Sequence, residues 1–255
     1  ATHDTGSAVA AIPVKKGQSD FIYISSGTWS LMGIQTDKPI LSQKALENNF
    51  TNEGGFGHTF RFLKNIMGLW IIQECRREWH KTGMQLDYEQ LIDLANKATP
   101  FASLFDPDDE QFLAPGDMPK RLKEYWIKSE QEFVDSPGSL VRSTLESLSL
   151  KYRYTCELIE SILQRNFDVI HMVGGGVQNK LLCQFTANAT KKTVIAGPIE
   201  ATAIGNIIVQ AIGINEVSNI DQAHQLIRNS FVTKTYTPRE NEIWDSAYEK
   251  FVTII

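Results

Sequence analysis

Hydrophobic and polar residues alternate along two short stretches near the start of the chain, which predicts two neighbouring β-strands. The first stretch covers residues 21–25 and the second covers residues 28–34, with Ser26 and Gly27 between them. Serine and glycine are common in tight turns, because glycine adopts backbone conformations that other residues avoid. The pattern therefore predicts a β-hairpin with Gly27 at its tip.

A helical rhythm of hydrophobic residues dominates the rest of the chain. The longest helical pattern covers residues 139–164, and two further strands are predicted at 168–173 and 193–196. Other helices are predicted at 6–12, 61–80, 88–98, 178–190, 200–212, 220–228 and from Glu240 onward, with an extended stretch before Glu240, turns at 13–19 and 52–55, and a loop at 105–119. A hairpin followed by helices that alternate with strands is typical of an α/β domain with a mixed sheet.

Composition narrows the class of protein. The chain has 255 residues, 42% of them hydrophobic and 22% charged, which is ordinary for a soluble globular protein of one large or two small domains. Its net charge of −5 argues against a nucleic-acid partner. Without an apolar run of membrane length or a signal-like start, we expect no membrane association. Because the chain opens abruptly and lacks an initial Met, we also expect it to be part of something longer.

The three cysteines, Cys75, Cys156 and Cys183, lie far apart and lack the CxxC spacing of zinc sites. We expect them to be buried free thiols, which favours a reducing, cytoplasmic location. The histidines are scattered, and the sequence contains no Walker A, GxGxxG, GxSxG or HExxH motif. The acidic stretch 106–110 lacks the spacing and glycine of an EF-hand, so it is predicted to be a solvated turn rather than a calcium site.

Three consecutive glycines, Gly174, Gly175 and Gly176, follow the predicted strand at 168–173 and precede Gln178 and Asn179. Residues without a Cβ at the carboxyl end of a strand allow a ligand to contact the main chain. The next helix would point its free N–H groups at the same place, which suits a phosphate or a polar base edge. A tight strand-to-helix turn without a ligand is the alternative.

Two further features carry candidate chemistry. The hairpin tip, with Gly27 and Thr28, offers backbone N–H groups and hydroxyls to a phosphate, although a plain hairpin explains the same residues. Asp4 precedes the small, apolar residues of the first helix, where Asp4 or Thr5 could serve as its N-cap. The carboxylate of Asp4 could instead act as a base that takes a proton from a hydroxyl group.

Six short motifs, in this order along the chain, resemble the carboxyl-terminal half of the FGGY carbohydrate kinases. They are HDTGSAV, SSGTWSLMG, TNEGG, LKNIMGLW, VGGGVQN and AGPIEATAIGN. The resemblance implies an α/β, actin-like and ribonuclease-H-like fold, in which two domains bind ATP between them. It runs from residue 1 almost to the C-terminus, so residues 1–255 would form the carboxyl-terminal, nucleotide-binding domain without the amino-terminal one.

The resemblance also implies roles for individual residues. Asp4 would be the catalytic base, and the residues near the sugar would be His3, Asp4, Thr5 and Asn65. The nucleotide would be bound by Gly27 and Thr28 at the β- and γ-phosphates, by Gln73, and by Gly174, Gly175, Gly176, Gln178 and Asn179 at the adenosine. Eight residues apart on one helix, Asn65 and Gln73 could line a single groove. Ala203, Gly205 and Asn206 would lie on a helix at the hinge between the domains.

The implied activity is transfer of the γ-phosphoryl group of ATP to a ketose, with Mg²⁺ as the second cofactor. The resemblance favours L-rhamnulose as the sugar, with fuculose, xylulose and glycerol as alternatives, and a non-catalytic nucleotide-binding module is a further alternative. In the family the first phosphate loop, the metal-holding carboxylate and much of the sugar pocket belong to the amino-terminal domain. We therefore expect no metal ligand here and no turnover by this chain alone.

Overall fold

The centre of the molecule is a mixed β-sheet. The computed structural model describes residues 3–18, 20–239 and 241–255. Its strands are β1 (Ile22–Ser26), β2 (Trp29–Thr36), β3 (Thr51–Gly54), β4 (Phe60–Met67), β5 (Val169–Val173), β6 (Thr193–Ala196) and β7 (Lys234–Tyr236), in the order β3-β4-β2-β1-β5-β6-β7. β5 runs parallel to its neighbours β1 and β6, whereas the other pairs are antiparallel. The predicted hairpin and mixed sheet are confirmed.

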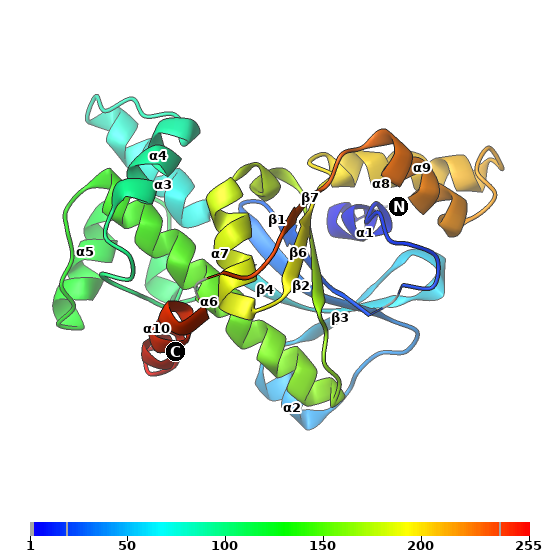
Figure 1. Ribbon diagram of the computed structural model, residues 1–255, viewed down its shortest axis with the longest axis horizontal. Coiled ribbons are helices and arrows are strands. Elements are labelled where there is room, and N and C mark those ends of the chain that lie inside the picture. Colours follow the sequence, from blue (N-terminus) through cyan, green and yellow to red (C-terminus); the bar gives the residue numbers. More distant parts are fainter. Residues whose placement is uncertain (1–2, 19, 240) are drawn as a thin grey trace.

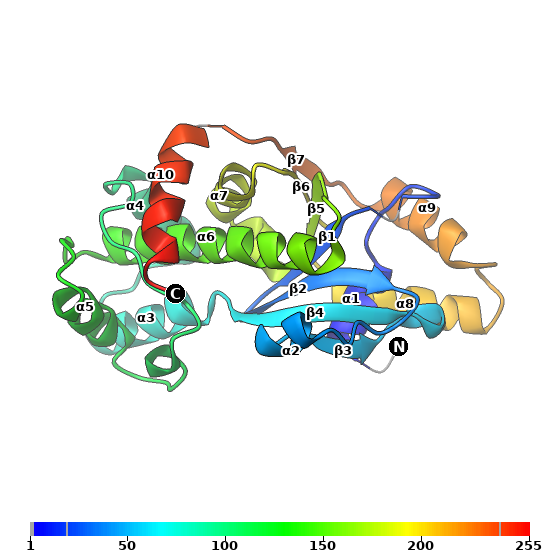
Figure 2. The ribbon, with the colours of Figure 1, turned by 90° about the horizontal axis from the view of Figure 1, so that it is seen from below.

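Helices cover both faces of the sheet (Figures 1 and 2). They are α1 (Asp4–Ala10), α2 (Gln43–Glu47), α3 (Trp70–Lys81), α4 (Tyr88–Lys97), α5 (Met118–Lys128), α6 (Pro137–Leu163), α7 (Lys180–Thr190), α8 (Ala201–Gly213), α9 (Ile220–Ser230) and α10 (Asn241–Val252). α6, α7 and α10 lie on one face, and α1, α8 and α9 lie on the other. α3, α4 and α5 extend beyond one end of the sheet.

The alternation along β1 separates two hydrophobic cores, because successive side chains of a strand point to opposite faces. Ile22 and Ile24 pack in the large core with α6 and α7. Phe21 and Tyr23 pack in the smaller core with α1. The three cysteines are buried and unpaired, as predicted. Within the part of the chain that the structure describes, none of the helices combines the length and hydropathy of a membrane span.

The segment predicted as one helix over 61–80 is instead strand β4 followed by helix α3. Phe62 and Ile66, four residues apart, share a face in a strand as well as in a helix, so their spacing did not distinguish the two. Pairing of β4 with β2 on one side and β3 on the other decided for the strand. Residues 52–54, predicted to lie in a turn, belong to β3 for the same reason.

Smaller differences concern the ends of elements and two helices that were not predicted, α2 and α5. His3 is the N-cap of α1, and Asp4 is the first helical residue rather than the cap. α5 begins at Met118, within the last residues of the predicted loop at 105–119. The predicted start of the last helix, Glu240, lies outside the described residues, and the described helix α10 begins at Asn241. The remaining predicted helices and strands are confirmed within a few residues.

Candidate functional site

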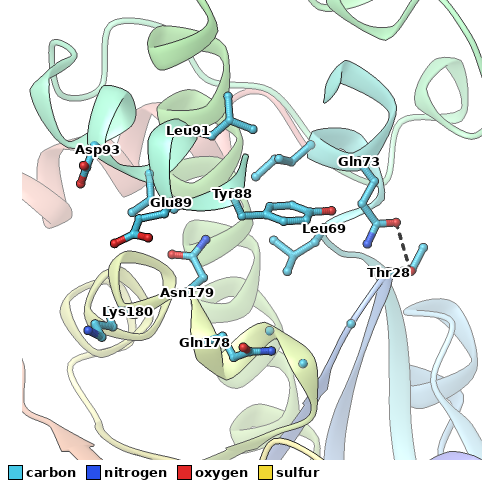
Figure 3. A pocket seen from close by; sticks show the side chains of 15 residues that line it. Thr28, Leu69, Gln73, Tyr88, Glu89, Leu91, Asp93, Gln178, Asn179 and Lys180 are labelled. Atoms are coloured by element: carbon cyan, nitrogen blue, oxygen red, sulfur yellow. Dashed lines mark hydrogen bonds between the residues drawn. The ribbon is translucent and has the colours of Figure 1, made fainter. Parts of the chain in front are cut away.

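Two glycine-containing segments that lie far apart in the sequence meet at one edge of the sheet. β1 and β5 are parallel neighbours, and Ser25 lies opposite Val173 in their register. Because parallel strands end at the same edge, the turn after β1 and the glycines after β5 are brought side by side. A cavity of about 700 Å³ opens there, between this edge and the helices α3 and α4 (Figure 3).

The cavity is lined by five structural elements of the chain. They contribute Gly27 and Thr28 from the β1–β2 turn, Leu69, Ile72 and Gln73 from the start of α3, Tyr88, Glu89, Leu91, Ile92 and Asp93 from α4, Gly175, Gly176 and Gln178 from the glycine loop, and Asn179 and Lys180 from the start of α7. Every residue predicted to contact the nucleotide lines it except Gly174. The structure thus gathers these predicted residues in one place.

The three glycines have different surroundings. Gly174 adopts a φ of +89°, and a Cβ there would lie 2.8 Å from the carbonyl oxygen of Ser26. A Cβ on Gly176 would overlap the Ser26 hydroxyl, whereas a Cβ on Gly175 would meet no atom within 4 Å. The outer two glycines therefore let the loop pack directly on β1, and Gly175 presents its main chain to the cavity.

Hydrogen bonds fix the glycine loop from both sides. The Gly174 N–H donates to the carbonyl of Pro198, at 3.1 Å, in the neighbouring loop. The side chain of Asn179 accepts from the Leu182 N–H, at 3.0 Å, and so caps the N-terminus of α7. Gln178 is exposed at the rim of the cavity. The loop is therefore held in place, with free N–H groups at the start of α7 next to the cavity.

The β1–β2 turn is held by the start of α3. The N–H of Leu69 donates to the carbonyl of Gly27 at 3.1 Å, and the N–H of Trp70 donates to the carbonyl of Thr28 at 3.0 Å. The Thr28 hydroxyl donates to Oε1 of Gln73 at 3.2 Å, as Figure 3 shows. Thr28 and Gln73 therefore form one polar pair at the mouth of the cavity.

Helix α4 forms the wall opposite the glycine loop, a role that sequence reasoning missed. Figure 3 shows the ring of Tyr88 extending from α4 toward Leu69 and Gln73. The helix was predicted from its hydrophobic rhythm, and a capping box between Asp87 and Gln90 defines its start. No signal in the sequence links this helix to the glycine loop, because its position across the cavity depends on how α4 packs on α6.

Charged groups around the cavity are few. Glu89 and Asp93 of α4 and Lys180 of α7 are its charged lining residues. Among residues 3–18, 20–239 and 241–255, no group of three or more His, Cys, Asp or Glu side chains is placed to hold a metal ion. The lining therefore suits a ligand bound mainly through main-chain N–H groups and apolar contacts, and it offers no cage for a free cation.

Asp4 and its neighbours lie apart from the cavity, on the side of the sheet covered by α1 and α8. The side chain of Asp4 is 76% exposed. Its Oδ1 accepts from the Thr5 N–H at 2.6 Å and lies 3.2 Å from Nδ1 of His3. His3 is exposed, whereas Thr5 is buried. The structure thus presents one exposed carboxylate at the start of a short helix.

The prediction that Asn65 and Gln73 lie on one helix and line one groove is wrong. Asn65 is an exposed residue of strand β4, and Gln73 belongs to helix α3. Leu63 packs in the core with α1, so Asn65, two residues further along the strand, lies on that same face. Asn65 is therefore on the side of Asp4, while Gln73 faces the cavity.

Gly205 lies where helices α8 and α1 approach each other closely. A Cβ at this position would overlap the carbonyl oxygen of Ser7 in α1, so α8 and α1 touch through their main chains. Ala203 is exposed on the same helix, and Asn206 is half-buried. α8 thereby supports the helix that begins with Asp4.

The acidic stretch after residue 105 is not the solvated turn that the sequence suggested. Its first two carboxylates, Asp106 and Asp108, fold onto the buried amine of Lys151 in α6. A buried ammonium group requires nearby negative charge, which explains why this stretch is acidic.

Comparison with known protein families decides the class. The model of the FGGY family of carbohydrate kinases, C-terminal domain, matches residues 22–214. The chain belongs to this family. The matched segment runs from β1 to the residue after α8 and therefore contains both glycine elements and the cavity between them.

Curated relatives cover almost the whole of this FGGY chain. It is 45% identical to the rhamnulokinase of Bacteroides thetaiotaomicron over 98% of the chain and 50% of that protein. It is 42% identical to the rhamnulokinase of Bacillus subtilis over 94% of the chain and 48% of that protein. The chain thus spans about half the length of the curated relatives it matches.

Solved structures share the fold of this FGGY chain. A xylulose kinase from Rhodospirillum rubrum has a TM-score of 0.68 at 15% identity, over 98% of this chain and 49% of that one. A Plasmodium falciparum glycerol kinase with ADP has a TM-score of 0.65 at 15% identity, over the same shares. The predicted actin-like, ribonuclease-H-like fold is confirmed.

Proposed function

We propose that residues 1–255 form the nucleotide-binding half of an ATP-dependent kinase that converts L-rhamnulose to L-rhamnulose 1-phosphate. The observation that carries the nucleotide part is the meeting of Gly27, Thr28 and Gly175 around one cavity. The sugar part rests on relatives named rhamnulokinase that are 38–46% identical along nearly the whole chain. Other kinases of the family act on other sugars, so the sugar is the part most in need of a test.

In this proposal the nucleotide lies between the glycine loop and α4. The adenosine would contact the main chain at Gly174–Gly176, Gln178 and Asn179, and the aromatic ring of Tyr88 would pack against it from the other wall. The β- and γ-phosphates would extend toward Gly27 and Thr28, whose backbone and hydroxyl groups can donate to phosphate oxygens. A cavity of about 700 Å³ is within the usual range for such ligands.

Asp4 would accept the proton of the sugar hydroxyl as its oxygen attacks the γ-phosphorus and ADP leaves. His3, Thr5 and Asn65, on the same side of the sheet, would position the sugar. Phosphoryl transfer depends mainly on positioning and charge stabilisation, so one base and two phosphate-binding elements can suffice. The exposure of the Asp4 carboxylate leaves it accessible to a substrate.

The proposal requires a second half of the protein. Mg²⁺, when bound, neutralises phosphate charge, but the described residues offer no metal cluster, so its protein ligand and the first phosphate loop would come from the amino-terminal half. The apolar surface at α8, where Ile207 of the helix and Ile214 just after it are exposed, is available to contact that half. We further propose that the protein works in the cytoplasm, where its buried thiols would remain reduced.

The test is ATP-dependent phosphorylation of L-rhamnulose, fuculose, xylulose and glycerol, measured for the intact protein and for residues 1–255 alone. We expect turnover only by the intact protein, with L-rhamnulose preferred. Preference for another sugar would overturn the substrate and leave the kinase. Nucleotide binding without turnover of any sugar would favour a non-catalytic binding module.

A further inference from the structure

A buried ion-pair cluster lies behind the candidate phosphate-binding turn and outside the cavity. Nζ of Lys151 in α6 lies 2.7 and 2.9 Å from the two carboxylate oxygens of Asp106. The same amine lies 3.3 Å from Oδ2 of Asp108. Lys151 is only 5% exposed, so its charge is balanced almost entirely by these two carboxylates. The cluster therefore fixes the loop at 105–112 to α6.

One of these carboxylates also reaches the end of β4. Oδ1 of Asp108 accepts a hydrogen bond from the N–H of Met67, at 2.8 Å. Further along the loop, the carbonyl of Phe112 accepts from Nε1 of Trp70, at 3.1 Å. Both contacts hold residues 67–70, the corner that joins β4 to α3. Met67 is buried, so without Asp108 its N–H would lose its partner in a site with little access to water.

This corner also holds the β1–β2 turn in place. Its Leu69 and Trp70 N–H groups donate to the carbonyls of Gly27 and Thr28, at 3.1 and 3.0 Å. A continuous series of short contacts thus runs from Lys151 through Asp108 and the corner to the turn. The other nearby amine, Lys64, donates to the carbonyl of Asn48 at 2.7 Å, and burial lowers its pKa. The Asp108 carboxylate opposes this lowering of the Lys64 pKa, so Lys64 is a second amine near Asp108, whereas Nζ of Lys151 lies 3.3 Å from its Oδ2.

We infer that Asp108, paired with Lys151, is a positioning residue that holds the β1–β2 turn in its phosphate-binding conformation. The inference rests on the proposed function, because it assigns the phosphates to Gly27 and Thr28. It predicts a selective defect: loss of Asp108 should weaken the binding of the phosphates and spare the binding of the adenosine, which uses the glycine loop and α4. A purely structural role would weaken both.

The experiment is isothermal titration of the intact protein with ADP and with adenosine. For Asp108→Ala we expect the Kd for ADP to rise about tenfold and the Kd for adenosine to stay within about twofold, because a tenfold change corresponds to the loss of one buried hydrogen bond. Asp108→Asn keeps an oxygen that can accept from Met67, so it should recover most of the ADP affinity. Recovery by the amide would identify the acceptor role rather than the charge alone.

Glu160→Ala is the matched control. Oε1 of Glu160 accepts from Lys192 at 2.7 Å and from the N–H of Phe167 at 2.9 Å, so this carboxylate of α6 also pairs with an amine and accepts from a backbone N–H. We expect Glu160→Ala to lower the melting temperature and leave both affinities unchanged. If Asp108→Ala does not fold, Trp70→Phe removes the second tie of the corner and should raise only the ADP Kd, by about twofold to threefold.

An unchanged ADP Kd in Asp108→Ala, or equal losses for ADP and adenosine, would overturn the inference. An unaltered protein that binds neither ligand would instead refute the proposed function. The two failures are therefore distinguishable.

Discussion

The carboxyl edge of the sheet and the face covered by α1 differ in how far this chain encloses them. At the carboxyl edge of β1 and β5, five elements enclose a cavity, and hydrogen bonds hold its backbone in place. On the face of α1, the residues proposed to meet the sugar are an exposed carboxylate on a short helix and an exposed amide on a strand. The first region has opposing walls, whereas the second is a single surface.

This difference implies two kinds of dependence on the proposed amino-terminal half. A cavity with opposing walls can bind its ligand without a second domain, because the contacting groups are already positioned. A single surface needs a partner to exclude water and to orient a small, polar sugar. We therefore expect nucleotide binding to survive in residues 1–255 alone and phosphoryl transfer to require the intact protein.

The largest expected effect comes from Asp4→Asn in the intact protein. Loss of a general base should lower kcat by about 10²- to 10⁴-fold, because the amide cannot accept the proton of the sugar hydroxyl. ADP affinity should be unchanged, since Asp4 does not line the cavity. Steady-state kinetics and calorimetry measure the two quantities, and Asp37→Asn, at an exposed position after β2, is the control. Near-normal turnover of Asp4→Asn would refute its role as the base.

The second prediction is that substitution of Gly176 affects stability, whereas substitution of the adjacent Gly175 affects ligand binding. A Cβ on Gly176 would overlap the Ser26 hydroxyl, so Gly176→Ala should lower the free energy of unfolding by about 1–3 kcal/mol. A Cβ on Gly175 meets no protein atom within 4 Å, so Gly175→Ala should unfold like the unaltered protein. Its methyl group would nevertheless project at the cavity and weaken adenosine binding. Denaturant unfolding and titration of both variants would show whether this split holds.

The two glycine-containing segments around the cavity show which features could be predicted from the sequence and which could not. A strand followed by three glycines and a helix was visible in the chain, and so was the hairpin with Gly27 at its tip. Their meeting depends on parallel pairing of β1 with β5, which no local pattern encodes. The family resemblance, rather than periodicity, predicted that these segments lie together.

Where one spacing of hydrophobic residues fits both a helix and a strand, the sequence was ambiguous. Phe62 and Ile66 fit a helix and a strand equally well, and pairing with β2 and β3 determined the outcome. The wrong helix placed Asn65 and Gln73 in one groove, although the corner at 67–70 separates them. Long-range ion pairs were equally hidden: Asp106 looked solvated because its partner, Lys151, is distant in the sequence.

A third prediction concerns the apolar surface of α8, which lies beside α1. Ile207 and Ile214 are 65% and 71% exposed, so residues 1–255 alone should self-associate through this helix. Replacing both isoleucines with serine should weaken this association by about tenfold in sedimentation measurements, because most of the apolar area of the patch is lost. Leu46→Ser, at a residue of α2 that is 69% exposed, is the control and should leave association unchanged. Association that persists in the double variant would place the contact elsewhere.

The smallest expected effect concerns pH and the wall of the cavity formed by α4. Arg142 of α6 donates to the carbonyl of Ala95 near the end of α4, at 3.2 Å, and pairs with the buried Glu146 at 2.7 Å. Glu146 also accepts from the N–H of Phe101 at 2.8 Å, just after the helix. The Arg142–Glu146 pair therefore holds the C-terminal end of α4 against α6. Burial raises the pKa of Glu146 to about 7, although Arg142 opposes the shift.

A raised pKa means that the folded protein holds this proton more tightly than the unfolded chain. The stabilising contribution of Glu146 is therefore complete below its ordinary pKa of 4.5 and is lost as the pH rises through about 7. Glu146→Gln, which cannot ionise, should gain stability relative to the unaltered protein between pH 5 and pH 8 in denaturant unfolding, whereas the exposed Glu124→Gln should show no such trend. Because Glu146 supports α4 and not α1, ADP affinity should follow the same pH range while the position of Asp4 is unaffected. A stability difference that does not change between pH 5 and pH 8 would show that Glu146 does not titrate in this range. ADP affinity would then be expected to stay constant over the same range.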